Sequence, residues 1–590
     1  MHESVTDCCK CQVYSFEPGY LQYEAYAEQK GCPGAEIQLA EYTINQQQDG
    51  ILRGIYEKKP DLLCFSCYIW NISFVRELIR DVKKILPKTR IWVGGPEVSY
   101  DAEDFLKEMP QVTGVICGEG EETFAEVVRT YAQWEKQEQE PGKLADVPGI
   151  VYRDGEKLVF TGNRDILNMD ELVFPYENLS LFEHKIIYYE SSRGCPFSCS
   201  YCLSSIDKKL RFRSVFLVKK ELQFFLDHQV PQVKFVDRTF NCKKEHAMEI
   251  WKYIKEHDNS ITNFHFEIAA DLLTEEEIGL IAAMRPGLIQ LEIGVQSTNE
   301  RTLQEIRRKT SFQEICKKVR AVAEGENVHQ HLDLIAGLPY EDYKSFQKSF
   351  CDVYALRPQQ LQLGFLKVLK GAYMEEMADA YGCVYKSKEP YEVLKTKWLT
   401  YGEISRLKGI EEMTEVYYNS GQFFYTLEAL VKEFPDAFTM YEELADFYKR
   451  KGYFAVSHAR ISRYEILREF LQEKGIQYLE FYDQLMVLDL YARENLKTRP
   501  SWAMDLKPYK RQIQAFYAKE EEQPEILKDY QGYQARQMEK MTHLEVFTYN
   551  VLEGKPEKGC YPVVFDYKKR NPLTYQGGIS RVSFFTEEEA

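Results

Sequence analysis

Short apolar runs alternate with amphipathic stretches along residues 35–135. DLLCFSCYIWN (Asp61–Asn71) is typical of a buried strand that runs into a loop, and FVRELIRDVKKIL has the period of an α-helix. TRIWVGGPEVS predicts a second strand and turn, and VTGVICGEGEETFAEVV predicts a third strand, a glycine turn and a helix. This alternation predicts a parallel, doubly wound sheet that binds ligands at the carboxyl ends of its strands.

A second alternation of strand and helix follows residue 180. VKFVDRTFN, NFHFEIAADLL, LIQLEIGVQS and HQHLDLIAGLP are strand-like, and an amphipathic helix follows each. They predict a partial (β/α) barrel, which LQLGFLKVLKG would close. VPGIVYRDGEKLVFTG predicts a hairpin around Asp154-Gly155. From about Pro390 to Leu552 the pattern is helical, and a β-rich tail follows it.

Composition narrows the class of protein. A chain of 590 residues is too long for one hydrophobic core, so about three or four domains are expected. The net charge of −17 argues against a general nucleic-acid or membrane surface. The 15 cysteines are irregularly spaced, which favours reduced thiols in the cytoplasm over a disulfide framework. No apolar run approaches the roughly 20 residues of a membrane span.

Three cysteines carry the clearest chemical signal: Cys195, Cys199 and Cys202, in SSRGCPFSCSYCLSS. Three thiolates can hold three corners of a four-iron, four-sulfur (4Fe–4S) cluster and leave the fourth iron open to a chelating cofactor. The alternatives are a zinc site and three ordinary buried thiols. A structural zinc site needs a fourth ligand at similar spacing, and neither Cys nor His follows closely.

RGCPFSCSYC resembles the cluster motif of the radical S-adenosylmethionine (SAM) enzymes, with its Arg193-Gly194 lead-in and with Tyr201 before the last cysteine. The resemblance implies that the open iron chelates the amino and carboxylate groups of SAM. One electron then cleaves a carbon–sulfur bond and releases a 5′-deoxyadenosyl radical. Tyr201 is implied to lie at the cofactor site.

The order of the upstream turns resembles the cobalamin-binding subfamily of radical SAM proteins. A strand ending FSxYxWN is followed by GGPE, GEGE and then the cysteine motif. The resemblance implies an N-terminal Rossmann-like domain that holds cobalamin without a protein histidine on cobalt, because a DxHxxG signature is absent. A Rossmann domain that has lost its cofactor is the alternative. The implied cobalamin contacts are Ser66, Tyr68, Trp70, Asn71, Gly94, Gly95, Pro96, Glu97, Gly118, Glu119 and Gly120.

Polar residues at the ends of the barrel strands are candidates for the active site, because such barrels act through their strand carboxyl ends. The resemblance implies that they contact SAM or the substrate, with GVQS near the ribose and the stretch at Gly337 packing the adenine. Asp237 and Arg238 are either catalytic or a structural ion pair, and Lys367 or Lys370 is a further candidate from the last strand. The expected cofactor contacts are Glu267, Asp271, Glu292, Gln296, Asp333 and Gly337.

The opening MHESVTDCCKCQVYSFEPGYLQYE has neither strand nor helix period, although the first strand of the sheet belongs there. With suitable codons, the neighbouring reading frame gives MNLLLTAVNAKYIHSNLAIYSM, an apolar strand followed by a loop and helix. This opening resembles that of a subgroup of the family with a C-terminal domain of unknown function (DUF4080). We hypothesise that about residues 1–24 are frameshifted. Cys8, Cys9 and Cys11 would then have no function, the alternative being a metal site, and the first strand would be missing.

The last third also resembles the DUF4080 region, a name that implies no chemistry. NSGQF (Asn419–Phe423) is interpreted as a helix cap, with a substrate contact as the alternative. The expected domains are a B12-binding domain (1–140), a connector hairpin (141–180), a radical SAM core with a partial (β/α)6 barrel (181–372) and a mostly helical DUF4080-like domain (373–590).

Together, the resemblances imply a cytoplasmic enzyme with a 4Fe–4S cluster, SAM and cobalamin. The leading interpretation is methyl transfer to an unactivated carbon or phosphorus centre of a small or lipid-like substrate. A flavodoxin or ferredoxin would supply electrons, and no nucleic acid is expected as a partner. The alternatives are a cobalamin-assisted rearrangement or reduction without methyl transfer, an RNA-modifying enzyme, and a catalytically silent cofactor-binding protein.

Overall fold

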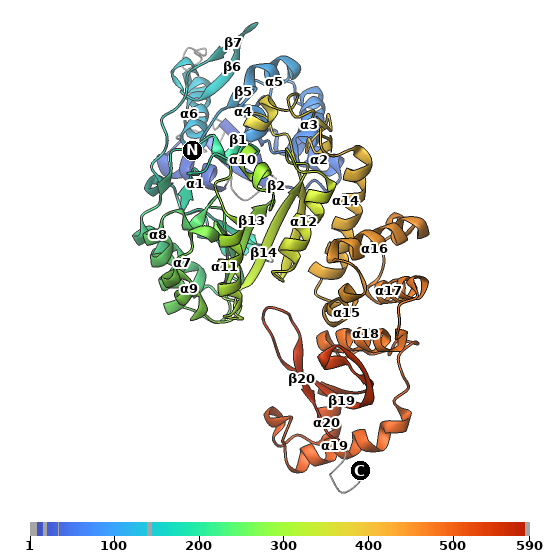
Figure 1. Ribbon diagram of the computed structural model, residues 1–590. Coiled ribbons are helices and arrows are strands. Elements are labelled where there is room, and N and C mark those ends of the chain that lie inside the picture. Colours follow the sequence, from blue (N-terminus) through green and yellow to red (C-terminus); the bar gives the residue numbers. More distant parts are fainter. Residues whose placement is uncertain (1–8, 16–20, 33–34, 138–143, 184, 585–590) are drawn as a thin grey trace.

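The computed structural model describes residues 9–15, 21–32, 35–137, 144–183 and 185–584. Its sheets and helices form an N-terminal α/β part, a central parallel barrel and a helical C-terminal part that extends away from the other two (Figure 1). The predicted α/β class and order of parts are confirmed. None of the helices in the described residues is long and apolar enough to cross a membrane.

The N-terminal sheet has seven strands in the order β2-β1-β3-β4-β5-β6-β7. The strands are β1 (Cys9–Ser15), β2 (Ala35–Glu41), β3 (Leu62–Ser66), β4 (Arg90–Gly94), β5 (Gly114–Ile116), β6 (Ile150–Asp154) and β7 (Lys157–Phe160). Those from β2 to β5 are parallel. The predicted hairpin forms as β6 and β7, which continue this sheet in the antiparallel direction.

Helices cover both faces of this sheet, as in a doubly wound fold. One hydrophobic cluster lies under α2, α3 and α5, and another lies under α1 and α6. β3, which has the apolar run LLCF before Ser66, is buried between them because a central parallel strand has no solvent face. The helices are α1 (Leu21–Lys30), α2 (Gln48–Lys58), α3 (Ile72–Ile85), α4 (Pro96–Ser99), α5 (Ala102–Glu108) and α6 (Glu121–Gln137).

The expectation that the chain as written lacks its first strand is wrong. β1 pairs in parallel with both β2 and β3, in the place of the missing strand. Backbone pairing with two neighbours holds a segment in a sheet even where the sequence has no apolar period. Cys8 lies outside the described residues. The frameshift itself concerns the gene and stays a prediction.

The second sheet is the predicted six-stranded barrel, with every neighbouring pair parallel. Its order is β8 (Ile187–Tyr189), β11 (Gln232–Phe235), β12 (Asn263–Ile268), β13 (Ile289–Gln296), β14 (His329–Ala336) and β15 (Gln360–Phe365). β15, the strand of LQLGFLKVLKG, pairs only with β14 within this sheet, so it lies at the edge and the barrel stays open. β8 has three residues, and no sequence pattern predicted it.

Alternation along the barrel strands separates an apolar outer face from a polar inner one. In β13 every second residue is buried, and Glu292 and Gln296 lie on the other face. The outer face packs under α7 (Val215–Asp227), α8 (Lys244–Glu256), α9 (Glu275–Ala282), α10 (Glu300–Glu305), α11 (Phe312–Ala323) and α12 (Tyr343–Tyr354). The polar groups therefore point into the barrel.

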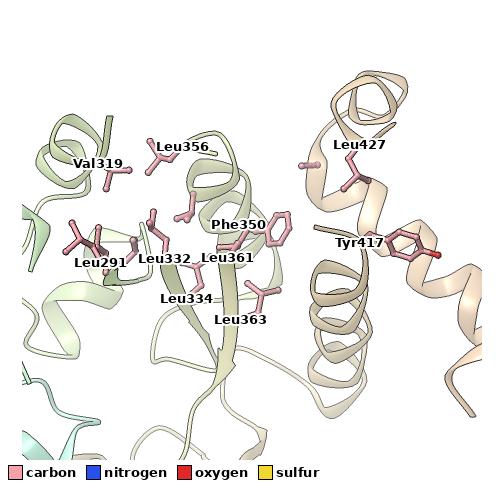
Figure 2. Packing of buried hydrophobic residues seen from close by; sticks show 14 of the residues in the cluster. Leu291, Val319, Leu332, Leu334, Phe350, Leu356, Leu361, Leu363, Tyr417 and Leu427 are labelled. Atoms are coloured by element: carbon pink, nitrogen blue, oxygen red, sulfur yellow. The ribbon is translucent and has the colours of Figure 1, made fainter. Parts of the chain in front are cut away.

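The C-terminal part continues the core of the barrel. Figure 2 shows Phe350 of α12 and Leu361 and Leu363 of β15 in the same cluster as Tyr417 and Leu427 of the helical part. The helices are α13 (Tyr373–Glu376), α14 (Tyr401–Met413), a π-helix (Thr414–Asn419), α15 (Phe424–Leu430), α16 (Ala437–Lys451), α17 (Arg460–Lys474), α18 (Leu479–Arg493), α19 (Lys510–Glu522) and α20 (Ala535–Met541).

Five strands complete this part. β16 (Val384–Tyr385) and β17 (Val393–Lys395) form a small antiparallel pair, and β18 (Thr542–Asn550), β19 (Lys555–Arg570) and β20 (Gly577–Arg581) form the predicted β-rich tail. Within Asn419–Phe423, Ser420 is the C-cap of the π-helix and Phe423 is the N-cap of α15, which has no side-chain cap hydrogen bond. Asn419 has another role. Its side chain exchanges two hydrogen bonds with the backbone of Leu361, each 2.9 Å long, and so docks the π-helix against the edge strand β15.

Candidate active site

The three cysteines lie in one loop, Gly194–Leu210, which we call the cysteine loop. The short antiparallel pair of β9 (Ser192–Arg193) and β10 (Arg211–Phe212) closes its base. Gly194 has φ +88°, and a Cβ there would lie 2.8 Å from the carbonyl oxygen of Lys209. Only glycine fits this close approach, which explains the Arg-Gly lead-in. Within the loop the amide of Cys195 donates to the carbonyl of Asp207 at 3.1 Å.

Cys195, Cys199 and Cys202 line one cavity of about 210 Å³ at the carboxyl ends of the barrel strands. The cavity's lining, drawn from the described residues, includes no histidine and no fourth cysteine. Three thiols without a fourth protein ligand fit a cluster with one open iron and do not fit a closed tetrahedral zinc site. The remaining lining is Phe197, Tyr201, Ser204, Arg238, Thr239, Glu267, Ile268, Ala269, Asp271, Glu292, Gly294, Gln296, Arg308, Lys309, Thr310 and Asp333.

The thiol of Cys199 lies against a cation, Arg308, that no sequence pattern indicated. Burial raises its pKa, and Arg308, whose Nη1 lies 3.8 Å from the Sγ atom, opposes that rise. Arg308 also donates to the carbonyl of Gly294 in β13. This side chain thus connects the cysteine loop to the barrel. Arg308 lies in the segment between α10 and α11, where no sequence pattern pointed to it.

Two carboxylates in the cavity differ in charge state. Burial and the neighbouring Glu292 raise the pKa of Glu267 to about 7. Burial alone would also raise the pKa of Glu292, but His265 and Lys234 outweigh it and lower the pKa to about 2. The Nε2 of His265 and the Nζ of Lys234 lie 3.0 Å and 3.1 Å from its Oε2. Near neutral pH, Glu292 is ionised and Glu267 is close to its midpoint.

Glu292, His331 and Asp333 place possible metal-ligand atoms within 4.8 Å of one another. Lys234 already contributes a positive charge to Glu292, and the Nε2 of His331 lies 3.0 Å from Asp333. Burial raises the pKa of Asp333, and pairing with Asp333 raises the pKa of His331 against the effect of burial. We interpret the group as a polar network on the barrel's inner face.

Asp237 and Arg238 do not form the ion pair that was considered for them. Asp237 is fully buried and accepts hydrogen bonds from Ser191 and Ser192, just before the cysteine loop. Burial raises its pKa to about 6. It does not line the cavity, so the geometry gives it a positioning role in place of the predicted catalytic one. Arg238 does line the cavity.

Most of the other predicted SAM-site residues meet in the same cavity. Tyr201, Asp271, Gln296 and Asp333 line it. Gln296 has φ +71° at a bulge in β13, which turns the chain at the strand end. Gly337 lies outside the lining: its φ is +93°, and a Cβ there would lie 2.8 Å from Val393 of β17.

The predicted cobalamin rim lies at the carboxyl ends of β3, β4 and β5. Tyr68 and Trp70 stack with ring centroids 4.6 Å apart, and Trp70 is 45% exposed. Gly118 has φ +74° with open space where a Cβ would stand. A stacked aromatic pair with one exposed ring and a bare backbone at a strand end fit a large planar ligand.

Other predicted rim residues serve the structure. The Asn71 side chain binds the backbone of Ser66 and Tyr68, and Gly95 (φ +109°) approaches the carbonyl of Cys67 so closely that a Cβ would lie 2.6 Å from it. Gly94 ends β4 and Pro96 begins α4. Glu97 is buried and accepts a 2.9 Å hydrogen bond from Tyr391, which joins the N-terminal domain to the C-terminal part.

Tyr23 fills the space between the ends of these strands. A Cβ on Gly120 would lie 2.7 Å from its hydroxyl, and the cavity left beside Tyr23 is only about 20 Å³. The rim residues therefore fit the face of a planar ligand. The space between the carboxyl ends of β3, β4 and β5, which we call the slot, has no room for a nucleotide tail while Tyr23 occupies it.

Ion pairs join the rim to the cysteine loop. Arg193 pairs with Glu121 at 2.5 Å and with Glu190 at 2.9 Å, and Arg211 pairs with Glu119 at 2.6 Å. Glu119 thus joins two domains, and its predicted cofactor contact stays a prediction. Lys370 pairs with Asp101 of the N-terminal domain at 2.7 Å, away from the cavity.

A second cavity of about 630 Å³ adjoins the first, because Tyr201, Gln296 and Asp333 line both. Lys367, the other predicted lysine, lines this second cavity. Helix α14 of the C-terminal part contributes the opposite wall with Lys408, Glu411 and Glu412. The sequence gave no signal for these three residues, since their place depends on how the two parts pack.

Three family models match the chain in succession: the B12 binding domain at residues 18–128, the radical SAM superfamily at 189–350 and the protein of unknown function DUF4080 at 379–565. The fold and the cysteine cavity together define a radical SAM protein with a B12-binding domain. The chain is a member of the cobalamin-binding radical SAM group, in the subgroup with a C-terminal DUF4080 region.

Relatives of the chain include the cobalamin-dependent radical SAM methyltransferase TokK of Streptomyces tokunonensis, 26% identical over 52% of this chain and 45% of TokK. An anaerobic magnesium-protoporphyrin IX monomethyl ester cyclase of Cereibacter sphaeroides is 21% identical over 50% of this chain and 49% of the cyclase. The chain spans about half the length of these curated relatives.

Among solved structures, the cobalamin-dependent SAM radical enzyme OxsB, with aqua-cobalamin and SAM bound, has a similar fold. The TM-score is 0.55 at 16% identity, over 82% of this chain and 79% of OxsB.

Proposed function

We propose that this chain is a radical SAM enzyme that uses a 4Fe–4S cluster, SAM and cobalamin, and that it transfers a methyl group to an unactivated carbon or phosphorus centre. The observation that carries the proposal is the cavity in which three thiols are the only soft ligands among the described lining residues. When bound, these groups supply the one-electron and methyl-transfer chemistry.

The chain's own residues would hold and orient these groups. Cys195, Cys199 and Cys202 would ligate three irons, while Arg308 offsets the charge at Cys199. Glu292 and Glu267 place negative charge where the cationic SAM would lie. The stacked Tyr68 and Trp70 and the bare Gly118 would support the corrin. Asp237 would hold the cysteine loop through Ser191.

The substrate chamber would be the second cavity, with the DUF4080 region as one wall. Glu412→Trp would fill this chamber from α14 without touching the cysteine cavity. The purified variant should still cleave SAM, while metabolite profiles of cells that express it should lose the product seen with the wild type. An unchanged product profile would contradict this assignment.

Methyl transfer is tested with SAM labelled at its methyl group. The anaerobically reconstituted chain, given cobalamin, a reductant and a metabolite extract of the native host as the source of the substrate, should release 5′-deoxyadenosine and S-adenosylhomocysteine and place the label in the product. A second candidate is a cobalamin-assisted rearrangement or reduction, because one relative is a cyclase. That reaction would release 5′-deoxyadenosine and leave the product unlabelled.

We also propose a cytosolic location with a flavodoxin or ferredoxin as electron donor. The cysteines from Cys32 to Cys560 are all free thiols, as expected in a reducing compartment. Fractionation of the native host, followed by immunoblotting, tests the location; recovery outside the soluble cytosolic fraction would contradict it.

A further inference from the structure

A groove of about 750 Å³ lies beside the cysteine loop. Its lining includes Ser198 and Lys208 of the loop and the segment that leads from α10 into α11. Arg308, Lys309 and Thr310 line both this groove and the cysteine cavity. A single layer of residues therefore separates the groove from the three thiols.

The groove is basic, although the chain as a whole carries a charge of −17. The lining contains four basic residues, Lys208, Arg307, Arg308 and Lys309, and one acidic residue, Glu300. We call this surface the basic groove. Lys208, Arg307 and Lys309 are exposed, and none of the three belongs to an ion pair found among the described residues. Asp207 beside them is already paired with Arg211 at 2.9 Å, and Lys209 adds another exposed positive charge.

Direct contacts connect the basic groove to the cysteine loop. Lys208 donates to the hydroxyl of Ser198 at 3.1 Å, and the amide of Ser200 donates to the carbonyl of Ile306 at 3.0 Å. The guanidinium of Arg307 lies 3.6 Å from the centroid of the Tyr373 ring, which fixes its position. The groove is thus a positioned surface next to the thiols.

We propose that the basic groove is the docking surface of an acidic one-electron carrier protein of the flavodoxin class. The inference rests on the proposed function, because it requires a cluster at the three cysteines. In the step it serves, one electron leaves the reduced carrier and enters the oxidised cluster; the carrier is oxidised, the cluster is reduced, and no bond forms or breaks. An acidic carrier is repelled by most of this chain, and the local positive potential orients it toward the thin wall at Arg308–Thr310.

The test is the rate at which a reduced acidic flavodoxin reduces the reconstituted full-length chain, followed anaerobically by stopped-flow absorbance of the cluster. The wild-type rate should fall as ionic strength rises. In the double variant Lys208→Glu and Lys209→Glu, the bimolecular rate constant at low salt should fall about tenfold, and the difference from wild type should vanish at high salt.

The matched control reverses the charge of Lys58 and Lys59. These two exposed lysines lie before β3, at the opposite end of the N-terminal sheet from the glycine turns. Their reversal to Glu should leave the flavodoxin rate within about twofold of wild type, as expected for charges remote from the interface. Dithionite, which needs no docking surface, should reduce all three proteins equally. The proposal would be overturned if flavodoxin reduced the Lys208/Lys209 variant as fast as it reduces the wild-type chain. It would also be overturned if flavodoxin did not reduce the wild-type chain at all. A chain that assembles no cluster would instead contradict the proposed function.

Discussion

Glu267 and Glu292 show how neighbouring side chains give two adjacent carboxylates different ionisation states. Both point into the barrel from adjacent strands, paired in register. His265 and Lys234 keep Glu292 ionised, and burial together with the negative charge of Glu292 raises the pKa of Glu267 to about 7. A proton therefore resides at Glu267 for about half of the time near neutral pH.

Glu267 should make SAM binding depend on pH. Above its pKa of about 7 it is negative and attracts the SAM cation; below that value it is neutral. The dissociation constant of the reconstituted protein for SAM should therefore fall about threefold to tenfold as pH rises from about 6 to about 8. Glu267→Gln should flatten this dependence in equilibrium titrations.

Glu292→Gln provides the contrast. Because the pKa of Glu292 is about 2, its charge is constant over this range, so the variant should bind SAM more weakly at every pH. Loss of the Glu292 charge also lowers the pKa of Glu267, so the pH dependence of SAM binding should remain but shift to lower pH. A pH dependence that survives unchanged in Glu267→Gln would contradict the assignment.

For single residues, the sequence predicted which side chains line the active-site cavity better than it predicted the partners that each side chain contacts. The cysteine spacing and the strand-end positions of Glu267, Glu292 and Asp333 placed side chains that do share a cavity. Asp237 satisfied the same strand-end rule, yet its partners are two serines behind the loop. Which way a strand-end side chain turns depends on tertiary neighbours that a single sequence does not reveal.

Among the elements, the cysteine loop depends on one backbone conformation. Gly194→Ala would add both a left-handed strain of about 1–3 kcal/mol and a contact 2.8 Å from the carbonyl of Lys209. The variant should bind less iron and sulfide after reconstitution. Gly452→Ala is the control, because Gly452 also has a positive φ (+73°) but has open space around its Cβ position. Equal iron contents in the two variants would contradict the role of this close approach.

Helix α1 contains the obstacle to a cobalamin tail. Tyr23 must leave the slot between β3, β4 and β5 before a tail can enter, which lowers the apparent affinity by the fraction of molecules that are open. Tyr23→Ala should therefore bind hydroxocobalamin about tenfold more tightly in a spectral titration. Exposed Tyr56, replaced by Ala, should leave the affinity unchanged. Weaker or equal binding by Tyr23→Ala would show that Tyr23 does not occupy the slot of the ligand.

Hydrophobic periodicity predicted most elements of the first two parts. Buried strands such as β3 have uninterrupted apolar runs, and amphipathic helices such as α3 have a clear period. β1 was missed because pairing with β2 and β3 holds it in place without such a pattern. β8 was missed because three residues are too few for any period to appear.

In the whole molecule, one continuous core joins the barrel to the DUF4080 region (Figure 2). The hydrogen bonds from Asn419 to Leu361 and from Tyr391 to Glu97 add polar contacts between the parts. The DUF4080 region is thereby held against the barrel's open edge, where it contributes a wall of the second cavity. The sequence predicted a helical part but not its docking surface, because contacts between distant segments leave no local pattern.

The central claim is that the three cysteines hold the cluster that cleaves SAM, and the most direct measurement is the yield of 5′-deoxyadenosine from the reconstituted, reduced chain. The wild type should produce it, and Cys199→Ala should produce none and show no cluster absorbance. Cys242→Ala, whose thiol lies outside the cavity lining, should behave as the wild type. Undiminished 5′-deoxyadenosine from Cys199→Ala, or none from the wild type with its cluster intact, would contradict the account.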